Sequence, residues 1–173
     1  MAPTTYTPPI NTYVPLESIV LTNAASDITF FNIAQSDANG TYKDFVIVYE
    51  GTGSTATYPY LRINGDTGNN YYYVSMAGYS GGTFSGATNA NRIILPYSEA
   101  NQKATGMISL QDATASDKHK TSLIRQMGYD AGLSSWAMAG RWASTTAVSA
   151  ITIGRDTGTW NSGAIFSIFG IHG

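Results

Sequence analysis

The sequence predicts an all-β protein, an antiparallel β-sandwich or jelly roll of about 10–11 strands. Three observations lead to this fold class. Apolar residues come in short runs, many with the two-residue period of a strand, and turn residues separate the runs. Helical periodicity is scarce, and strands do not alternate with helices as they do in α/β folds. The aromatic content of 12%, with 12 Tyr, is too high for a disordered linker, although the chain has 21 Thr, 18 Gly, 17 Ser and 11 Asn.

An extended arm, residues 1–15, is expected to precede a single sandwich domain, residues 16–173. Pro3, Pro8 and Pro9 hold the arm extended and remove backbone hydrogen-bond donors. The strands of the sandwich are expected to follow at spacings of about 12 to 16 residues. They are residues 17–22, 27–33, 42–50, 60–64, 70–76, 92–97, 104–112, 119–127, 135–142, 149–154 and 164–171.

Two of the expected strands are apolar on both faces. Residues 45–49, FVIVY, are apolar without interruption, as expected for a strand that is covered on both sides. The C-terminal strand 164–171, AIFSIFGI, is expected to be central in a sheet or buried in a subunit interface.

The connections also follow from the residue types. The segment Gly-Asp-Thr-Gly-Asn between strands 60–64 and 70–76 predicts a tight, hairpin-like turn. Residues 78–91 contain four glycines and are expected to form the longest loop.

Composition argues against several classes of function. Without cysteine the chain has no disulfide, no thiolate zinc site and no cysteine nucleophile. Charged residues make up 12% and the net charge is −2, with Lys and Arg scattered, which argues against nucleic-acid binding. No segment approaches the roughly 18 to 20 apolar residues of a membrane span. The first residues lack the pattern of a signal peptide. We therefore expect no nucleic acid, no membrane and no cofactor as partners.

Residues that could perform catalysis are few, and no pattern pairs them. His119 follows Asp117 on a polar turn, His172 is the penultimate residue, and no G-x-S-x-G motif occurs. A glycosidase needs two facing carboxylates, and no signal links the three glutamates, Glu17, Glu50 and Glu99. The sequence therefore predicts no catalytic residue and no enzyme. Lys118 and Lys120 are expected to share one strand face, as a solvated or salt-bridged edge.

Two neighbouring segments are candidate binding sites. Residues 64–70, NGDTGNN, carry oxygen ligands of the kind that Ca²⁺ prefers but lack EF-hand spacing, so a turn with Asx hydrogen bonds is favoured and ion binding is left open. In the run Tyr71, Tyr72 and Tyr73, the first and third share one strand face and the second takes the other. One face is expected to pack inside, and the other offers tyrosine to a glycan or a subunit interface.

Several segments match one family pattern in the same order along the chain. Residues 42–48, YKDFVIV, are similar to Y-x-D-L-V-L-V, and residues 61–71, LRINGDTGNNY, to L-R-F-N-G-D-T-G-x-N-Y. Residues 120–125, KTSLIR, fit the same order. Residues 141–154 match a Trp strand that leads to an I-x-I strand. Residues 158–163 match a G-x-[FW]-x-x-G turn, and residues 164–171 match a terminal S-x-F-S-L-Y-G-I strand. Taken together, these segments resemble virion proteins of tailed bacteriophages. The terminal strand departs at Ile165, Ile168 and Phe169, and His172 and Gly173 extend it, but the exchanges remain apolar.

The resemblance implies a β-sandwich virion component without enzymatic activity. Such proteins decorate capsids in some virions and form tail-fibre or receptor-binding domains in others. Only about a dozen residues precede the first expected strand here, without the repeat of a fibre shaft. We therefore expect a capsid decoration (cement) protein that binds and stabilises the outer capsid surface. The alternative is a tail, neck or tail-fibre-tip protein that binds a host receptor or glycan.

This reading also predicts the partners and their sites. The expected partners are the major capsid protein, other virion proteins and further copies of the chain, with a trimer favoured. The expected location is the virion, assembled in the host cytoplasm. The arm and its junction supply the residues expected to contact partners, Pro3, Tyr6, Pro8, Pro9, Ile10 and Tyr13, and the possible glycan or interface face is Tyr71, Tyr72 and Tyr73.

Overall fold

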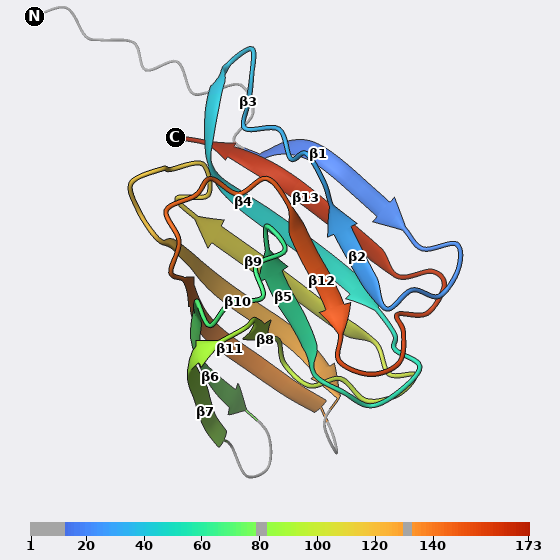
Figure 1. Cartoon of the computed structure of the whole chain (residues 1–173). Helices are drawn as coiled ribbons and strands as arrows, with labels where there is room; N and C mark the ends of the chain where they lie inside the picture. Colours follow the sequence, from blue (N-terminus) through green and yellow to red (C-terminus); the bar gives the residue numbers. More distant parts are fainter. Residues whose placement is uncertain (1–12, 79–82, 130–132) are drawn as a thin grey trace, which may run out of the picture.

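Two antiparallel sheets pack face to face in the computed structural model, which describes residues 13–78, 83–129 and 133–173 (Figure 1). The large sheet runs in the order β1 (Tyr13–Val20), β13 (Ile165–His172), β4 (Gly40–Gly51), β9 (Ala104–Gln111), β10 (Lys120–Tyr129), β11 (Leu133–Trp142), β6 (Tyr71–Gly78) and β7 (Thr83–Ala90), with β3 (Ser36–Asp37) paired to β4. The small sheet runs in the order β2 (Asp27–Phe30), β12 (Ile151–Arg155), β5 (Pro59–Ile63) and β8 (Ile93–Ile94). The predicted fold class, an antiparallel β-sandwich of the jelly-roll kind, is confirmed. Among the described residues, no helix has the length and apolar character needed to cross a membrane.

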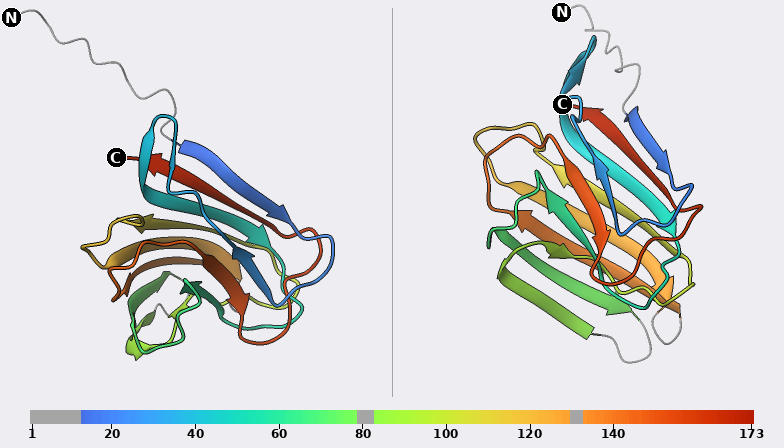
Figure 2. Two further views of the ribbon diagram at one scale, coloured as in Figure 1. Left: turned by 45° about the horizontal axis from the view of Figure 1, so that its top comes forward. Right: turned by 45° about the vertical axis from the view of Figure 1, so that its right-hand side comes forward.

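The chain passes back and forth between the two layers. Most connections cross from one sheet to the other, and the β3–β4, β6–β7 and β9–β10–β11 connections stay within the large sheet. The two views of Figure 2 show the small sheet lying over one face of the large one. The first and last described strands, β1 and β13, pair with each other at one edge. Within residues 13–78, 83–129 and 133–173, no layer covers the opposite face of the large sheet.

The core lies between the sheets, and Trp160 is among its largest side chains. Trp160 is fully buried, and its ring centroid lies 5.3 Å from that of Phe166 and 6.2 Å from that of Tyr49. The guanidinium carbon of Arg155 lies 4.8 Å from the centroid of the Trp160 ring. The backbone N–H of Trp160 donates to the carbonyl of Ala25 over 2.7 Å. A loop residue thus joins the connection after β1 to the centre of the sandwich.

The strand bounds differ from the prediction in several places. β1 begins at Tyr13, so the predicted arm 1–15 is wrong at its last three residues, which pair with β13. The predicted loop 78–91 is also wrong, because β7 occupies Thr83–Ala90 and pairs with β6. This strand lacks an apolar period since its residues are mostly Thr, Ser, Ala and Gly, and its pairing rests on backbone hydrogen bonds. β8 is shorter than predicted, and β3 was not predicted.

The turn after β5 has the predicted chemistry but connects different layers. Asn64 and Gly65 have φ values of 51° and 66°, and the Asp66 N–H donates to the Ile63 carbonyl over 3.0 Å. These features define a type I′ turn, which favours Asn-Gly. The two flanking strands do not pair as a hairpin, because β5 belongs to the small sheet and β6 to the large sheet.

The two strands that are apolar on both faces are covered on one face within the monomer. In β4, Phe45, Ile47 and Tyr49 are buried against the small sheet, whereas Val48 on the opposite face is 40% exposed. In β13, Phe166 and Ile168 are buried and Ile165 is 36% exposed. On the opposite face of β4, Val46 is buried at 5% exposure, so the single chain meets the prediction that residues 45–49 are covered on both sides except at Val48.

We predict that Gly106→Ala destabilises the protein by about 1–3 kcal/mol, the usual cost of overpacking a core. A Cβ at Gly106 would overlap the buried ring of Tyr49 in the adjacent strand. Urea denaturation of purified protein measures the change. Gly78→Ala is the matched control, since the nearest atom to its Cβ would be the Ser135 carbonyl oxygen at 3.6 Å. Equal stability of the two variants would contradict this packing.

Candidate interaction surface

The face of the large sheet that points away from the small sheet is the candidate functional site, and we call it the outer face. The strand register places its side chains in rows across the sheet. The central row consists of Ser18, Ser167, Val48, Met107, Arg125, Ala137, Met76 and Phe84. The row on one side contains Val20, Ile165, Glu50, Thr105, Met127 and Ser135, and the row on the other contains Pro15, Phe169, Val46, Ser109, Leu123, Ala139 and Val74.

Large apolar side chains gather on the outer face. Their exposed fractions range from 36% for Ile165 to 81% for Phe84. Contiguous apolar patches of more than a few hundred Å² are uncommon on monomeric proteins and mark interaction sites. The exposed members of this face include Val20, Val48, Val74, Met76, Phe84, Met107, Leu123, Met127, Leu133 and Ile165.

Charge on the outer face is sparse. Arg125 stands in the central row, and among the described residues it takes part in none of the ion pairs. Glu50, in the adjacent row, has its carboxylate 3.0 Å from the ammonium nitrogen of Lys103, and both side chains are exposed. Arg141, further along, lies with its guanidinium carbon 4.4 Å from the centroid of the Tyr72 ring.

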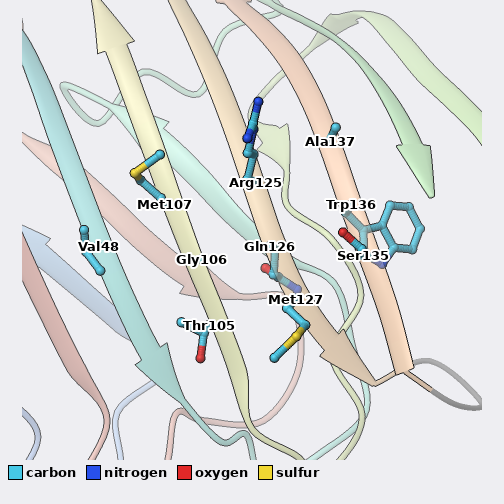
Figure 3. A pocket seen from close by; sticks show the side chains of 10 residues that line it. All are labelled: Val48, Thr105, Gly106, Met107, Arg125, Gln126, Met127, Ser135, Trp136 and Ala137. Carbon is cyan, nitrogen blue, oxygen red and sulfur yellow. The ribbon is translucent and has the colours of Figure 1, made fainter. Parts of the chain in front are cut away.

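Two hollows lie side by side on this face. The first, of about 520 Å³, is lined in part by Val48, Met107 and Met127, which come from three adjacent strands (Figure 3). The second, of about 370 Å³, is lined in part by Val74, Met76, Phe84, Leu123 and Ala139. Arg125 and Ala137 line both hollows. The outer face therefore alternates apolar projections with depressions over the small residues of β11.

The three consecutive tyrosines divide between the two faces of β6, as predicted. Tyr71 is fully buried, its hydroxyl donates to the Ile63 carbonyl over 3.2 Å, and burial raises its pKa to about 12. Tyr73 packs partly buried against the core. Tyr72 lies on the outer side, where its hydroxyl donates to Asn89 Oδ1 over 2.7 Å and Arg141 covers its ring. As a correction, the surface proposed for glycan or subunit contact does not include Tyr71, because its ring lies inside the sandwich.

The loop 64–70 is organised around the carboxylate of Asp66. Oδ2 accepts hydrogen bonds from Trp142 Nε1 over 2.6 Å and from Asn70 Nδ2 over 2.9 Å, and Oδ1 accepts one from the Gly68 N–H over 2.7 Å. Burial opposes ionisation of Asp66, but these hydrogen bonds together outweigh it and lower its pKa. The oxygen-rich sequence thus serves as an anchored turn, with Asp66 holding the end of β11 by Trp142.

The residues considered for catalysis lie apart. His119 is exposed, whereas His172 is largely buried, with its ring centroid 4.9 Å from that of Tyr42 and its Nε2 3.3 Å from Asp37 Oδ1. Within the described ranges, no three His, Cys, Asp or Glu side chains are grouped as metal ligands.

The expected basic edge is not formed as predicted, because Lys120 points inward. Its ammonium group donates to the carbonyls of Ala115 over 2.6 Å, Lys118 over 2.7 Å and Thr145 over 3.2 Å. Burial lowers the pKa of Lys120. Lys118 stays exposed, 3.7 Å from Asp112. The alternation that the sequence suggested fails here because Lys118 lies in the turn before β10 and not in the strand.

Most of the predicted arm site lies outside the described residues. This applies to Pro3, Tyr6, Pro8, Pro9 and Ile10. Tyr13 is described: it is the first residue of β1, it pairs with Ile171, and it is 58% exposed.

The comparisons with known proteins add little. No family model matches the chain, and no curated protein matches it. Among solved structures, a mutant of alginate lyase Aly36B in complex with alginate tetrasaccharide is 9% identical, with a TM-score of 0.28, over 95% of this chain and 98% of the lyase chain.

The outer face was missed by reasoning from the sequence. A signal was present in β10, where Leu123 and Met127 alternate with Ile124 and Gln126, so that both sides of one strand carry large side chains. A similar signal occurs in β6 at Val74 and Met76. Such patterns predict a strand covered on both faces, but they do not tell which side is covered within the chain.

We predict that Asp66→Asn lowers the free energy of unfolding at pH 7 by about 1–3 kcal/mol, because an amide NH₂ would face one of the present donors. The lowered pKa of Asp66 stabilises the fold above the unfolded pKa of about 3.9, and this contribution is lost as the pH falls through the folded value. The difference from wild type should therefore shrink from pH 7 to pH 3 in urea denaturation. Asp117→Asn, at an exposed site, is the control. A difference that is independent of pH would contradict the role of the Asp66 charge.

Proposed function

We propose that this chain is a structural protein of a tailed-bacteriophage virion, and that it decorates the outer surface of the capsid and stabilises it. The observation that carries the proposal is the outer face, an apolar and sparsely charged sheet surface that no part of the described chain covers. A protein that works within an assembly has a use for such a surface, because association removes it from water.

The residue types on the outer face support a protein partner. The centres of protein interfaces are enriched in Met, aromatic residues and Arg and depleted in Lys, Glu and Asp. Met76, Met107 and Met127 lie on this face beside Arg125, with Phe84 at its β7 edge. The composition therefore fits a dry protein contact.

The segments that resemble phage virion proteins support the scaffold of this proposal. Residues 61–71 form β5, the type I′ turn, the Asp66 anchor and the buried Tyr71, so each conspicuous residue of that motif has a structural role. Trp160, within the resembling turn 158–163, lies at the centre of the core. The residues of these segments serve the fold of this chain, and we place the partner-binding residues elsewhere.

The proposed role is non-enzymatic. In the hollow of Figure 3, Arg125 is the ionisable residue of the lining. A guanidinium stays protonated at all ordinary pH values, so it does not act as a general acid or base. It is well suited to hydrogen bonding with a partner's carboxylate or carbonyl groups.

We further propose that residues 1–12 make the contact with the major capsid protein and other virion proteins. β1 begins at Tyr13 at the edge of the large sheet, so removal of residues 1–12 leaves every described strand in place. The truncated protein should keep the circular-dichroism spectrum of the full chain and lose binding to purified capsids in co-sedimentation. Unchanged capsid binding would contradict this assignment.

The copy number of the protein in purified particles tests the location on the virion. A decoration protein should be present in hundreds of copies, as measured by quantitative mass spectrometry against the major capsid protein. A few to a few dozen copies would favour the alternative, a tail, neck or fibre-tip protein. Absence from the particle would contradict a virion role altogether.

A further inference from the structure

We propose that the outer face is covered by the outer face of a second copy of this chain, and that Arg125 of each copy pairs with Glu50 of the other. This inference deepens the proposed function, because it names the partner of the surface on which that function rests. The contact is an isologous dimer interface, formed by the same residues of both copies.

The size of the outer face suits such a dimer. Seven strands lie side by side in the sheet order β1, β13, β4, β9, β10, β11 and β6. At the usual spacing of about 4.8 Å they occupy a width of about 34 Å. Three rows of side chains, about 7 Å apart, extend about 20 Å along the strands. The resulting area of roughly 700 Å² per copy is close to the roughly 800 Å² that each partner contributes to a stable interface.

The positions of the arginines select the register of the two sheets. In a face-to-face pair the two-fold axis lies in the interface plane, and when it runs parallel to the strands, those at equal distances on either side of it face each other. With the axis along β10, Arg125 of one copy would lie against Arg125 of the other. With the axis along β11, the two Arg141 side chains would meet in the same way. Like charges in contact oppose association. An axis along β9 avoids both contacts and places β10 opposite β4, β11 opposite β13 and β6 opposite β1.

This register brings opposite charges together. Arg125 and Val48 share the central row on either side of Met107, so Arg125 of one copy lies over Val48 of the other. Glu50 lies one row further along β4, about 7 Å away, which is within the reach of an arginine side chain. The Glu50 carboxylate has Lys103 as one neighbour at 3.0 Å and has lone pairs left for a second donor. Packed sheets cross at about 30°, so the correspondence is closest at the centre, where this pair lies.

Side-chain size also matches across this axis. Phe169 of β13 comes to face Ala139 of β11, and Ile165 comes to face Ser135 in the adjacent row. In the central row Met76 comes to face Ser18. In these three pairs, which lie away from the axis, a large residue faces a small one, as close packing between two surfaces requires, whereas at the axis Met107 meets its own copy. The hollows over the small residues of β11 receive the projecting side chains of β13.

The dimer also accounts for the strands that are apolar on both faces. Val48 of β4 and Ile165 of β13, which are 40% and 36% exposed in the single chain, would lie between two sheets instead of facing water. Residues 45–49 would then be covered on both sides, as their composition predicts. A face-to-face contact of this kind is two-fold, so it gives a dimer and not the trimer that the sequence analysis favoured.

Charge reversal on the purified full chain tests the pairing. Sedimentation velocity should give a mass of twice 18.4 kDa for the wild type. R125E and E50R should each raise the dimer dissociation constant at least about tenfold, because each change places like charges together twice per dimer. The double variant R125E/E50R should restore the dimer. K118E is the matched control for R125E, with the same change in charge at an exposed site before β10, and it should remain dimeric.

Several outcomes would overturn the inference. These are a monomeric or trimeric wild type, a dimer that R125E leaves unchanged, or a double variant that stays monomeric while its circular-dichroism spectrum matches that of the wild type. The outcome is separate from that of the proposed function. If the protein is a monomer that still binds capsids, the dimer proposal alone is contradicted. If it is a dimer that is absent from the virion, the virion role alone is contradicted.

Discussion

The large sheet carries apolar side chains on both of its faces, and the small sheet covers one of them. This follows from the two-residue period of a strand, which sends neighbouring residues to opposite sides. In β4 the inward residues Phe45, Ile47 and Tyr49 build the core, while Val48 on the outward side remains in contact with water. The function proposed for the molecule depends on what covers this second apolar face.

The face of the large sheet that the small sheet covers is closely packed. Trp160 packs against Phe166 and Tyr49, and Gly106 leaves the space that the Tyr49 ring fills. The buried ammonium group of Lys120 is matched to partners, because it donates to three carbonyls. Buried polar groups without partners are costly, so such residues specify how loops seat on the sandwich. In the described part of the chain, the centre of the outer face has no comparable polar network, as an apolar contact between proteins requires.

The low charge of the chain has a physical meaning in this setting. Many surface positions that other proteins fill with Lys and Glu hold Thr, Ser and Asn here, and charged residues make up 12% of the sequence. Burying a charge at an interface requires a partner for it, whereas small polar residues cost less to remove from water. Arg125 and Glu50 are charged residues on the outer face, and their positions favour one register between two such faces.

The features that sequence reasoning predicted correctly are local ones. The two-residue period identifies most strands, the residue types of segment 64–70 predict a turn with Asx hydrogen bonds, and alternation divides Tyr71 and Tyr73 from Tyr72. The features that it missed depend on neighbours that are distant in the sequence. β7 is a strand because β6 offers it a backbone edge, and Lys120 points inward because three carbonyls from two loops converge on it.

By itself, then, the sequence determined a sandwich of short antiparallel strands with an unusually uncharged surface, because periodicity, turn residues and composition are properties of the chain alone. The tertiary structure decided which strands share a sheet and which apolar face stays exposed. The sequence of a strand shows that both of its sides are apolar. The layer that covers each side is supplied by residues far along the chain or by another molecule.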